Sequence, residues 1–219
     1  CPSSTAMVER SRWSSCATLA ACRSALDRGV GINLAVGTHH AHRAHGEGFC
    51  VFNDAAVAAR AMQAEGLARR VLVVDLDVHQ GDGTAAIFEG DAAVTTLSVH
   101  GRQNFPFRKR ASAIDVELDD GTTDDAYLAT LATVLPRAID RARPDLDDRL
   151  MHFTLDLLPQ HRRARRQELG DVRPQVSALG VDDLEFLLDA EGKAMHEGND
   201  TSVVSRQSVV FSRSLSPSR

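Results

Sequence analysis

Residues Val71 to Gly83 read VLVVDLDVHQGDG. Four apolar residues lead directly into two aspartates and a histidine, Asp75, Asp77 and His79. If one strand runs from Val71 to Val78, these side chains lie on one face, because alternate residues of a strand point the same way. Ligands of open α/β sheets bind at the carboxyl ends of the strands, and Asp with His suits zinc. The stretch therefore predicts a metal site where this strand ends.

A second polar stretch precedes the first, and it reads GTHHAHRAHGEGFCVFND from Gly37 to Asp54. Four of its first nine residues are histidines. Such a loop is also compatible with a solvated surface, and the acidic stretch alone is compatible with a polar turn. Taken together, the two stretches favour acid–base chemistry at a shared site.

The apolar periodicity predicts helices and strands in alternation, which favours a parallel α/β sheet with right-handed crossovers. The helices are expected at 11–27, 55–65, 84–88 and 124–141, and the strands at 31–36, 71–78, 94–99 and 114–118.

Composition narrows the class of protein. The 219 residues suffice for one domain, and a net charge of -5 argues against binding nucleic acid through bulk charge. No apolar run approaches the ~20 residues that a membrane span needs. The four cysteines include no Cys-x-x-Cys pair, which favours a reduced, cytoplasmic or nuclear protein.

Three stretches resemble the zinc-dependent histone deacetylase and acetylpolyamine amidohydrolase superfamily. They are GTHHAHRAHGEGFCVFND, RRVLVVDLDVHQGDGTAAIF, and VTTLSVHG followed by NFPF. The resemblance covers about residues 8–146. It implies an incomplete three-layer arginase/deacetylase-like fold, in which helices flank a mainly parallel sheet. We therefore expect a partial catalytic domain over 1–146, a divergent segment with short helices over 147–201, and a disordered Ser/Arg tail over 202–219.

The resemblance also implies roles for individual residues. Asp77 and His79 would be zinc ligands, and His39 and His40 would be the catalytic pair, oriented by Asp75 and Asp82. The implied reaction is hydrolysis of an acetyl-lysine type amide, in an acetylated protein or a small acetylated amine, with release of acetate. A potassium site is implied at Asp75, Asp77, His79, Ser98 and Val99, and a substrate tunnel at Gly48, Phe49 and Phe105.

Two parts of the family pattern are not found. The family supplies a third zinc ligand, an Asp, after a strand that should follow Ala142 to Leu146, but Asp147 and Asp148 stand where apolar residues are needed. We therefore expect no core strand there, with Asp147, Asp148 or Asp156 as possible substitute ligands. The family also supplies an oxyanion-stabilising Tyr from a Gly-rich loop, whereas the single Tyr127 matches nothing catalytic. Loss of an oxyanion donor typically costs about 10²–10³ in rate.

Three functions remain open on this basis. The first is a zinc-dependent deacetylase, and the second is a catalytically impaired relative that acts as a binding module. The third is an arginase-like dimanganese hydrolase, which requires more carboxylates than the sequence places at the site. The sequence leaves the choice of acetylated substrate and the oligomeric state open.

Overall fold

The computed structural model describes residues 4–34, 37–142, 149–156 and 206–212. Its elements are α1 (Thr5–Arg28), β1 (Val30–Asn33), α2 (Asp54–Ala64), β2 (Arg70–Asp75), α3 (Asp82–Phe88), β3 (Val94–Gly101), β4 (Ile114–Leu118), α4 (Asp124–Ala142), β5 (Arg149–Asp156) and β6 (Arg206–Ser212). Among the described helices, none is both long enough and apolar enough to cross a bilayer.

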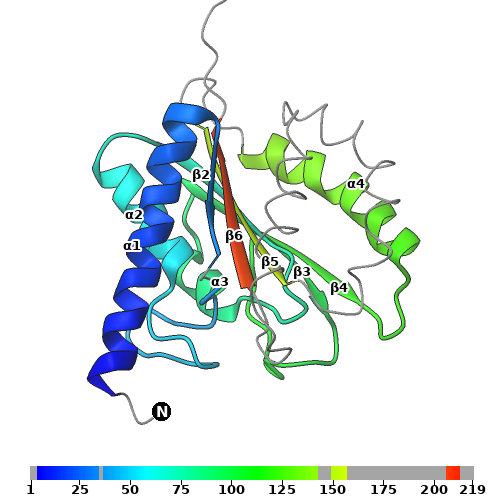
Figure 1. Ribbon diagram of the computed structural model, residues 1–219. Helices are drawn as coiled ribbons and strands as arrows, with labels where there is room; N and C mark the ends of the chain where they lie inside the picture. Colours follow the sequence, from blue (N-terminus) through cyan, green and yellow to red (C-terminus); the bar gives the residue numbers. More distant parts are fainter. Residues whose placement is uncertain (1–3, 35–36, 143–148, 157–205, 213–219) are drawn as a thin grey trace, which may run out of the picture.

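The six strands form one sheet in the order β1-β6-β5-β2-β3-β4. Strands β5, β2, β3 and β4 run parallel to one another, whereas β6 is antiparallel to both β1 and β5. Helices α1, α2 and α3 cover one face of the sheet and α4 covers the other (Figure 1). The predicted three-layer α/β fold with a mainly parallel sheet is therefore confirmed.

Strand β2 shows why the central run is apolar at every position. Val71 and Val73 belong to a core cluster with α1 and α2, whereas Leu72 and Val74 belong to a second cluster with α4. A strand buried on both faces needs apolar residues without alternation. The VLVV run therefore fixes β2 in the middle of the three layers, and its polar continuation emerges at the carboxyl edge.

The strand is shorter than predicted, since it ends at Asp75 rather than Val78. Asp75 Oδ1 accepts a hydrogen bond from the Asp77 amide at 3.1 Å, and Asp77 Oδ1 accepts one from the His79 amide at 2.8 Å. Aspartates that bond the backbone two residues ahead stabilise turns in place of strand pairing. The two carboxylates therefore turn the chain at the sheet edge.

The expectation of no core strand after Leu146 is wrong, because β5 begins at Arg149. It pairs in parallel with β2, with Asp75 opposite Thr154, so it occupies the next position in the sheet. The stretch RLMHFTLD is rich in apolar and β-forming residues, and the two aspartates before it delay the strand without abolishing it.

The C-terminal part also differs in detail from the expected Ser/Arg tail. Within residues 202–219, Arg206–Ser212 forms β6 between β1 and β5. Its central SVVF run has the β propensity that a Ser/Arg-rich composition conceals. The short helices expected within 147–201 fall on residues 157–205, which lie outside the described part of the chain.

Candidate functional site

Two buried His–Asp pairs lie beyond the carboxyl ends of the parallel strands. His39 Nδ1 lies 2.6 Å from Asp75 Oδ2, and His40 Nδ1 lies 2.7 Å from Asp82 Oδ1. The centroids of the two imidazole rings are 4.1 Å apart. All four residues are at most 4% exposed. The structure thus brings together the four residues that the sequence predicted as a catalytic group.

The side chain of Asn53 attaches the histidine loop, defined as the stretch from Gly37 to Asp54, to helices α2 and α3. Its amide nitrogen donates to the carbonyl oxygens of His39 and Ala41 and to the hydroxyl of Thr84. Its oxygen accepts from the Ala56 amide and so caps α2. One residue therefore fixes the loop relative to both α2 and α3.

Asp54 holds the start of the same loop at Thr38. It is 2% exposed, and its Oδ1 accepts from the amide and the hydroxyl of Thr38 at 3.0 and 2.6 Å. Its Oδ2 accepts from the Thr18 hydroxyl of α1 at 3.0 Å. Asn53 and Asp54 are not among the site residues expected from the sequence, and their burial reveals the positioning role.

Glycines leave room for the histidines. A Cβ on Gly48 would lie 2.5 Å from His40 Cδ2, and Gly48 also has a positive φ of 53°. A Cβ on Gly81 would collide with the carboxylate of Asp75 and approach His39 Nδ1 to 3.1 Å. Only glycine fits at either position without displacing the catalytic candidates.

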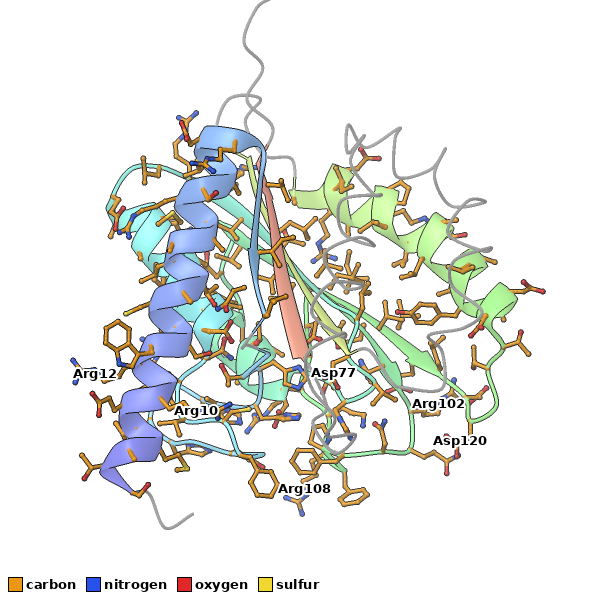
Figure 2. All side chains as sticks on the ribbon, viewed as in Figure 1. Arg10, Arg12, Asp77, Arg102, Arg108 and Asp120 are labelled. Carbon is orange, nitrogen blue, oxygen red and sulfur yellow. The ribbon has the colours of Figure 1, made fainter. Side chains whose placement is uncertain are left out.

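Asp77 and His79 form a carboxylate–imidazole pair beside the histidines. His79 Nδ1 lies 3.0 Å from Asp77 Oδ1, and Asp77 Oδ2 lies 4.0 Å from His39 Nε2. Asp77 is fully buried, whereas the His79 side chain is 33% exposed. Figure 2 shows Asp77 in the lower part of the view, at the end of the sheet from which the connecting loops emerge. A carboxylate oxygen and an imidazole nitrogen are donor types that suit a zinc ion.

Aromatic side chains border the histidines on one side. The Phe105 ring packs edge-on against His40 with centroids 4.9 Å apart, and its centroid lies 6.4 Å from that of His79. Phe49, expected in the same tunnel, is 96% exposed and has a positive φ of 64°. Phe107 is 85% exposed and lies edge-on to Phe105. The described site therefore has one closely packed aromatic wall and two exposed phenylalanines.

Of the residues predicted to bind potassium, Ser98 and Val99 lie on β3, the strand next to β2, Asp75 ends β2, and Asp77 and His79 follow it. Ser98 is paired with Asp75 in the register of β2 and β3, and both line a small cavity with Gly81 and Thr84. The Ser98 hydroxyl hydrogen-bonds His100 Nδ1 at 2.9 Å. Val99 is buried in the α4 cluster, on the opposite face of β3. Asp75 and Ser98 are therefore adjacent, whereas the side chain of Val99 points away from them.

The carboxylate of Asp82 has contacts on both of its oxygens. Its Oδ1 contacts His40, and its Oδ2 lies 3.4 Å from His42 Nε2. Burial acts to raise the pKa of Asp82, but the hydrogen bond from His40 and the charges of His40 and His42 together lower it below 3.8. Asp82 therefore stays ionised at neutral pH and favours a proton on Nδ1 of His40.

The fold and this cluster define an α/β protein with a buried acid–base site at the carboxyl edge of its sheet. The histone deacetylase domain matches residues 1–146. The chain therefore belongs to the histone deacetylase domain family.

Individual relatives agree with this assignment. An uncharacterized protein of Picosynechococcus is 46% identical over 66% of this chain and 48% of its own length. The acetoin utilization protein AcuC of Bacillus subtilis is 36% identical over 52% of this chain and 32% of its own length. Histone deacetylase 2 of Arabidopsis thaliana is also 36% identical, over 59% of this chain and 34% of its own length. The chain thus spans between about a third and a half of these relatives.

Solved structures give the same result. An HDAC homologue complexed with SAHA matches with a TM-score of 0.56 and 29% identity, over 64% of this chain and 40% of that one. An acetylpolyamine aminohydrolase from Burkholderia pseudomallei matches with a TM-score of 0.51 and 27% identity, over 62% of this chain and 43% of that one.

Proposed function

We propose that this chain carries the acid–base part of a zinc-dependent amide hydrolase that releases acetate from acetyl-lysine type substrates. The observation that carries the proposal is the pair of buried His–Asp dyads beside Asp77 and His79. Membership in the histone deacetylase domain family supports amide hydrolysis rather than the dimanganese chemistry of an arginase-like enzyme.

The donors of Asp77 and His79 fit two positions of a zinc site. At metal–ligand distances of about 2.0–2.2 Å, two ligands of a tetrahedral ion lie about 3.3–3.6 Å apart. The observed 3.0 Å between His79 Nδ1 and Asp77 Oδ1 is a hydrogen-bond distance, about 0.3–0.6 Å shorter than that separation, so a bound ion would move the two atoms slightly apart. When bound, zinc would polarise the amide carbonyl and lower the pKa of a water molecule toward about 7.

The sequence offers Asp156, at the end of β5, as a substitute third ligand. Thr154 pairs with Asp75, the last residue of β2, and Asp156 follows two residues later at the end of β5. Adjacent strands lie about 4.8 Å apart, so the end of β5 adjoins the sheet edge at which β2 ends. We include Asp156 in the proposal as the third ligand. Asp147 and Asp148, the other two substitutes that the sequence offers, lie outside the described residues.

The two dyads supply the proton transfers. With Nδ1 donating to Asp82, neutral His40 presents the lone pair of Nε2, which accepts a proton from the attacking water. As the carbon–nitrogen bond breaks, the same proton passes to the leaving amine, giving acetate and a free amine. Asp75 holds His39 in the corresponding orientation, so that His39 supports the charge that develops beside His40.

The aromatic side chains indicate the form of the substrate. Phe105 offers an apolar wall next to His40, and the exposed Phe49 and Phe107 extend the apolar surface outward. Methylene groups of an acetylated lysine or polyamine bury well against such rings. We propose an acetylated protein or a small acetylated amine as substrate, with Gly48 leaving backbone room for it and with potassium near Asp75 and Ser98.

Acetate release from an acetyl-lysine peptide tests the proposal. We expect turnover by the zinc-loaded chain, loss of turnover after chelation, and a loss of at least about 10²-fold in His40→Asn. Glu89→Gln, an exposed carboxylate outside the site, is the control and should leave the rate unchanged. Turnover that survives chelation or the His40 change would contradict the proposed roles.

A second candidate is a catalytically impaired relative that binds acetylated ligands. It is favoured by the absence, among the residues the structure describes, of a tyrosine near the histidines, since Tyr127 packs against the α4 core cluster. Folded, zinc-loaded chain without turnover but with tighter binding of acetylated than of unmodified peptide would establish this alternative. Equal binding of both peptides would exclude it.

A further inference from the structure

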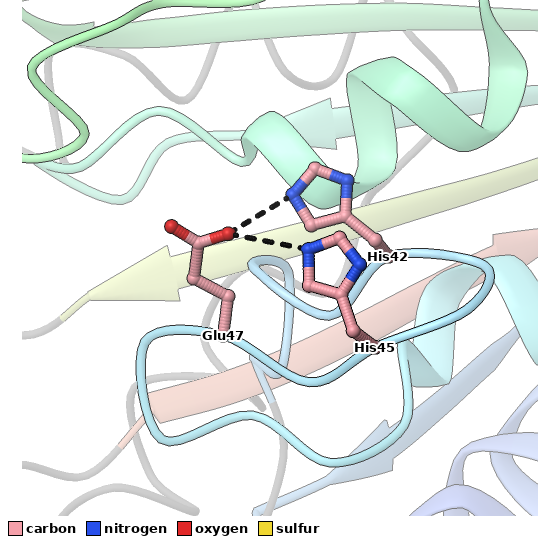
Figure 3. A group of neighbouring side chains, drawn as sticks. All are labelled: His42, His45 and Glu47. Atoms are coloured by element: carbon pink, nitrogen blue, oxygen red, sulfur yellow. Dashed lines mark ion pairs between the residues drawn. The ribbon is translucent and has the colours of Figure 1, made fainter. Parts of the chain in front are cut away.

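A second group of metal-ligand side chains lies in the histidine loop, outside the dyads. His42, His45 and Glu47 each offer one donor atom, and these atoms all lie within 4.8 Å of one another. Figure 3 shows both imidazoles turned toward the carboxylate of Glu47, with dashed lines marking the two ion pairs. We propose that these three residues bind a divalent transition-metal ion, such as Zn²⁺, at a site separate from Asp77 and His79.

The separations suit a shared ion. Nε2 of His42 lies 3.4 Å and Nε2 of His45 lies 3.6 Å from the same Glu47 oxygen, Oε2. Both distances exceed the usual 2.7–3.2 Å of an N–H···O hydrogen bond. They match the roughly 3.3–3.6 Å between two ligands of a tetrahedral ion with bonds of about 2.0–2.2 Å. The donors are therefore spaced as ligands and not as directly bonded partners.

The backbone holds the three residues in place before any ion binds. The His42 amide donates to the His45 carbonyl at 2.9 Å, which closes the turn between the two histidines. The Cys50 amide donates to the Glu47 carbonyl at 2.8 Å and closes the next turn. Gly46 lies between them, and a Cβ there would be 2.5 Å from the Cys50 carbonyl oxygen. The imidazole rings of His42 and His45 also stack, with centroids 4.5 Å apart.

The donor set defines the class of ion. Two imidazole nitrogens and one carboxylate oxygen suit Zn²⁺, Ni²⁺ or Cu²⁺, whereas Ca²⁺ and Mg²⁺ prefer oxygen donors. The His45 side chain is 61% exposed and that of Glu47 is 41% exposed, so a fourth position is open to water. The second oxygen of Asp82, 3.4 Å from His42 Nε2, adds negative charge beside the site.

Zinc binding to the chain with Asp77→Ala and His79→Ala tests the proposal apart from the catalytic site. We expect about one Zn²⁺ per chain by equilibrium dialysis, and binding weakened by more than about tenfold when His45→Ala or Glu47→Gln is added. Glu89→Gln is the matched carboxylate control, since it is exposed and distant in sequence. Absence of zinc from the double variant, or binding unaffected by the His45 and Glu47 changes, would overturn the proposal.

A second measurement uses the unmodified chain, in case the double variant does not fold. Exposed His45 should react readily with diethyl pyrocarbonate, and mass spectrometry of the peptide that contains it should show protection by Zn²⁺ but not by Mg²⁺. Equal modification with and without zinc would overturn the proposal. The proposed function fails separately: if the unmodified chain and the Asp77/His79 variant bind the same amount of zinc, the catalytic zinc is absent while this site stands.

Discussion

Asn53 connects the histidine loop to two helices, and its removal should cost more than the loss of a helix cap. Its oxygen accepts from the Ala56 amide at 3.0 Å and caps α2. Its nitrogen donates to the His39 carbonyl at 3.3 Å, the Ala41 carbonyl at 3.1 Å and the Thr84 hydroxyl at 2.9 Å. Since Asn53 is 4% exposed, water does not readily replace these bonds.

The expected magnitude follows from the two halves of this side chain. Loss of a cap costs about 1 kcal/mol. The Ala41 carbonyl and the Thr84 hydroxyl each lose a donor, which adds about 0.5–1.5 kcal/mol apiece, whereas the His39 carbonyl still accepts from the Thr84 amide. We therefore expect Asn53→Ala to lower the free energy of unfolding by about 3 kcal/mol. Ser4→Ala is the matched control: Ser4 caps α1 through one bond to the Met7 amide and is exposed, so its loss should cost only about 1 kcal/mol.

Urea unfolding of the two variants measures the difference, and hydrogen exchange at the Thr84 amide, which donates to the His39 carbonyl, measures local opening of the loop. Asn53→Asp adds a test within the site, because it keeps the capping oxygen but places a carboxylate against carbonyl oxygens. It should be nearly as destabilising as Asn53→Ala. Equal losses for Asn53→Ala and Ser4→Ala, or a stable Asn53→Asp, would refute the anchoring role.

Further predictions concern the core, the response to pH and the third ligand. Met62 is fully buried, so Met62→Ala should lower the free energy of unfolding by about 2–5 kcal/mol in urea titrations. The pKa of Asp82 is lowered below 3.8 in the folded chain, so its ionised carboxylate stabilises the fold fully above about pH 4, and this stabilisation is lost as the pH falls through the folded pKa. Asp82→Asn should therefore reduce the pH dependence of the melting temperature below about pH 4. Burial lowers the pKa of His100 below 6.5, so His100 binds a proton more readily in the unfolded chain than in the folded one. The free energy of unfolding should therefore fall as the pH drops from about 6.5, and His100→Asn should remove this part of the pH dependence. Asp156→Asn should weaken zinc binding by more than about tenfold, and unchanged affinity would remove Asp156 from the site.

Much of the fold follows from local sequence patterns. The VLVV run requires a strand buried on both faces, and the helices on either side follow from their apolar periodicity. Strand β6 has no comparable signal, because its short SVVF run is surrounded by serine and arginine. Its position between β1 and β5 depends on pairing with strands far away in the sequence, and local composition carries no information on such pairing.

The location of the candidate site can be predicted from the sequence, but its individual contacts cannot. The order of elements indicates that the histidine loop and the acidic turn meet at one sheet edge. Which histidine contacts which aspartate does not follow from that order; the assignment of His39 to Asp75 and His40 to Asp82 came from the family resemblance. The contacts of His42 and Asn53 were not anticipated, because a polar residue in a loop gives no sign in the sequence that it is buried.

Asp82 links the acid–base dyad to the second group of histidines. One of its oxygens contacts His40 and the other faces His42, so a change at His42 alters the surroundings of the catalytic dyad through a single carboxylate. Replacing His42 would therefore change both metal binding and the orientation of His40, and the two effects would not be separable. In the part of the chain that the structure describes, the ion pairs of His45 and Glu47 do not include the dyad residues, and both side chains are substantially exposed. Substitutions at these two positions are therefore the ones that separate a second metal site from the chemistry of the first.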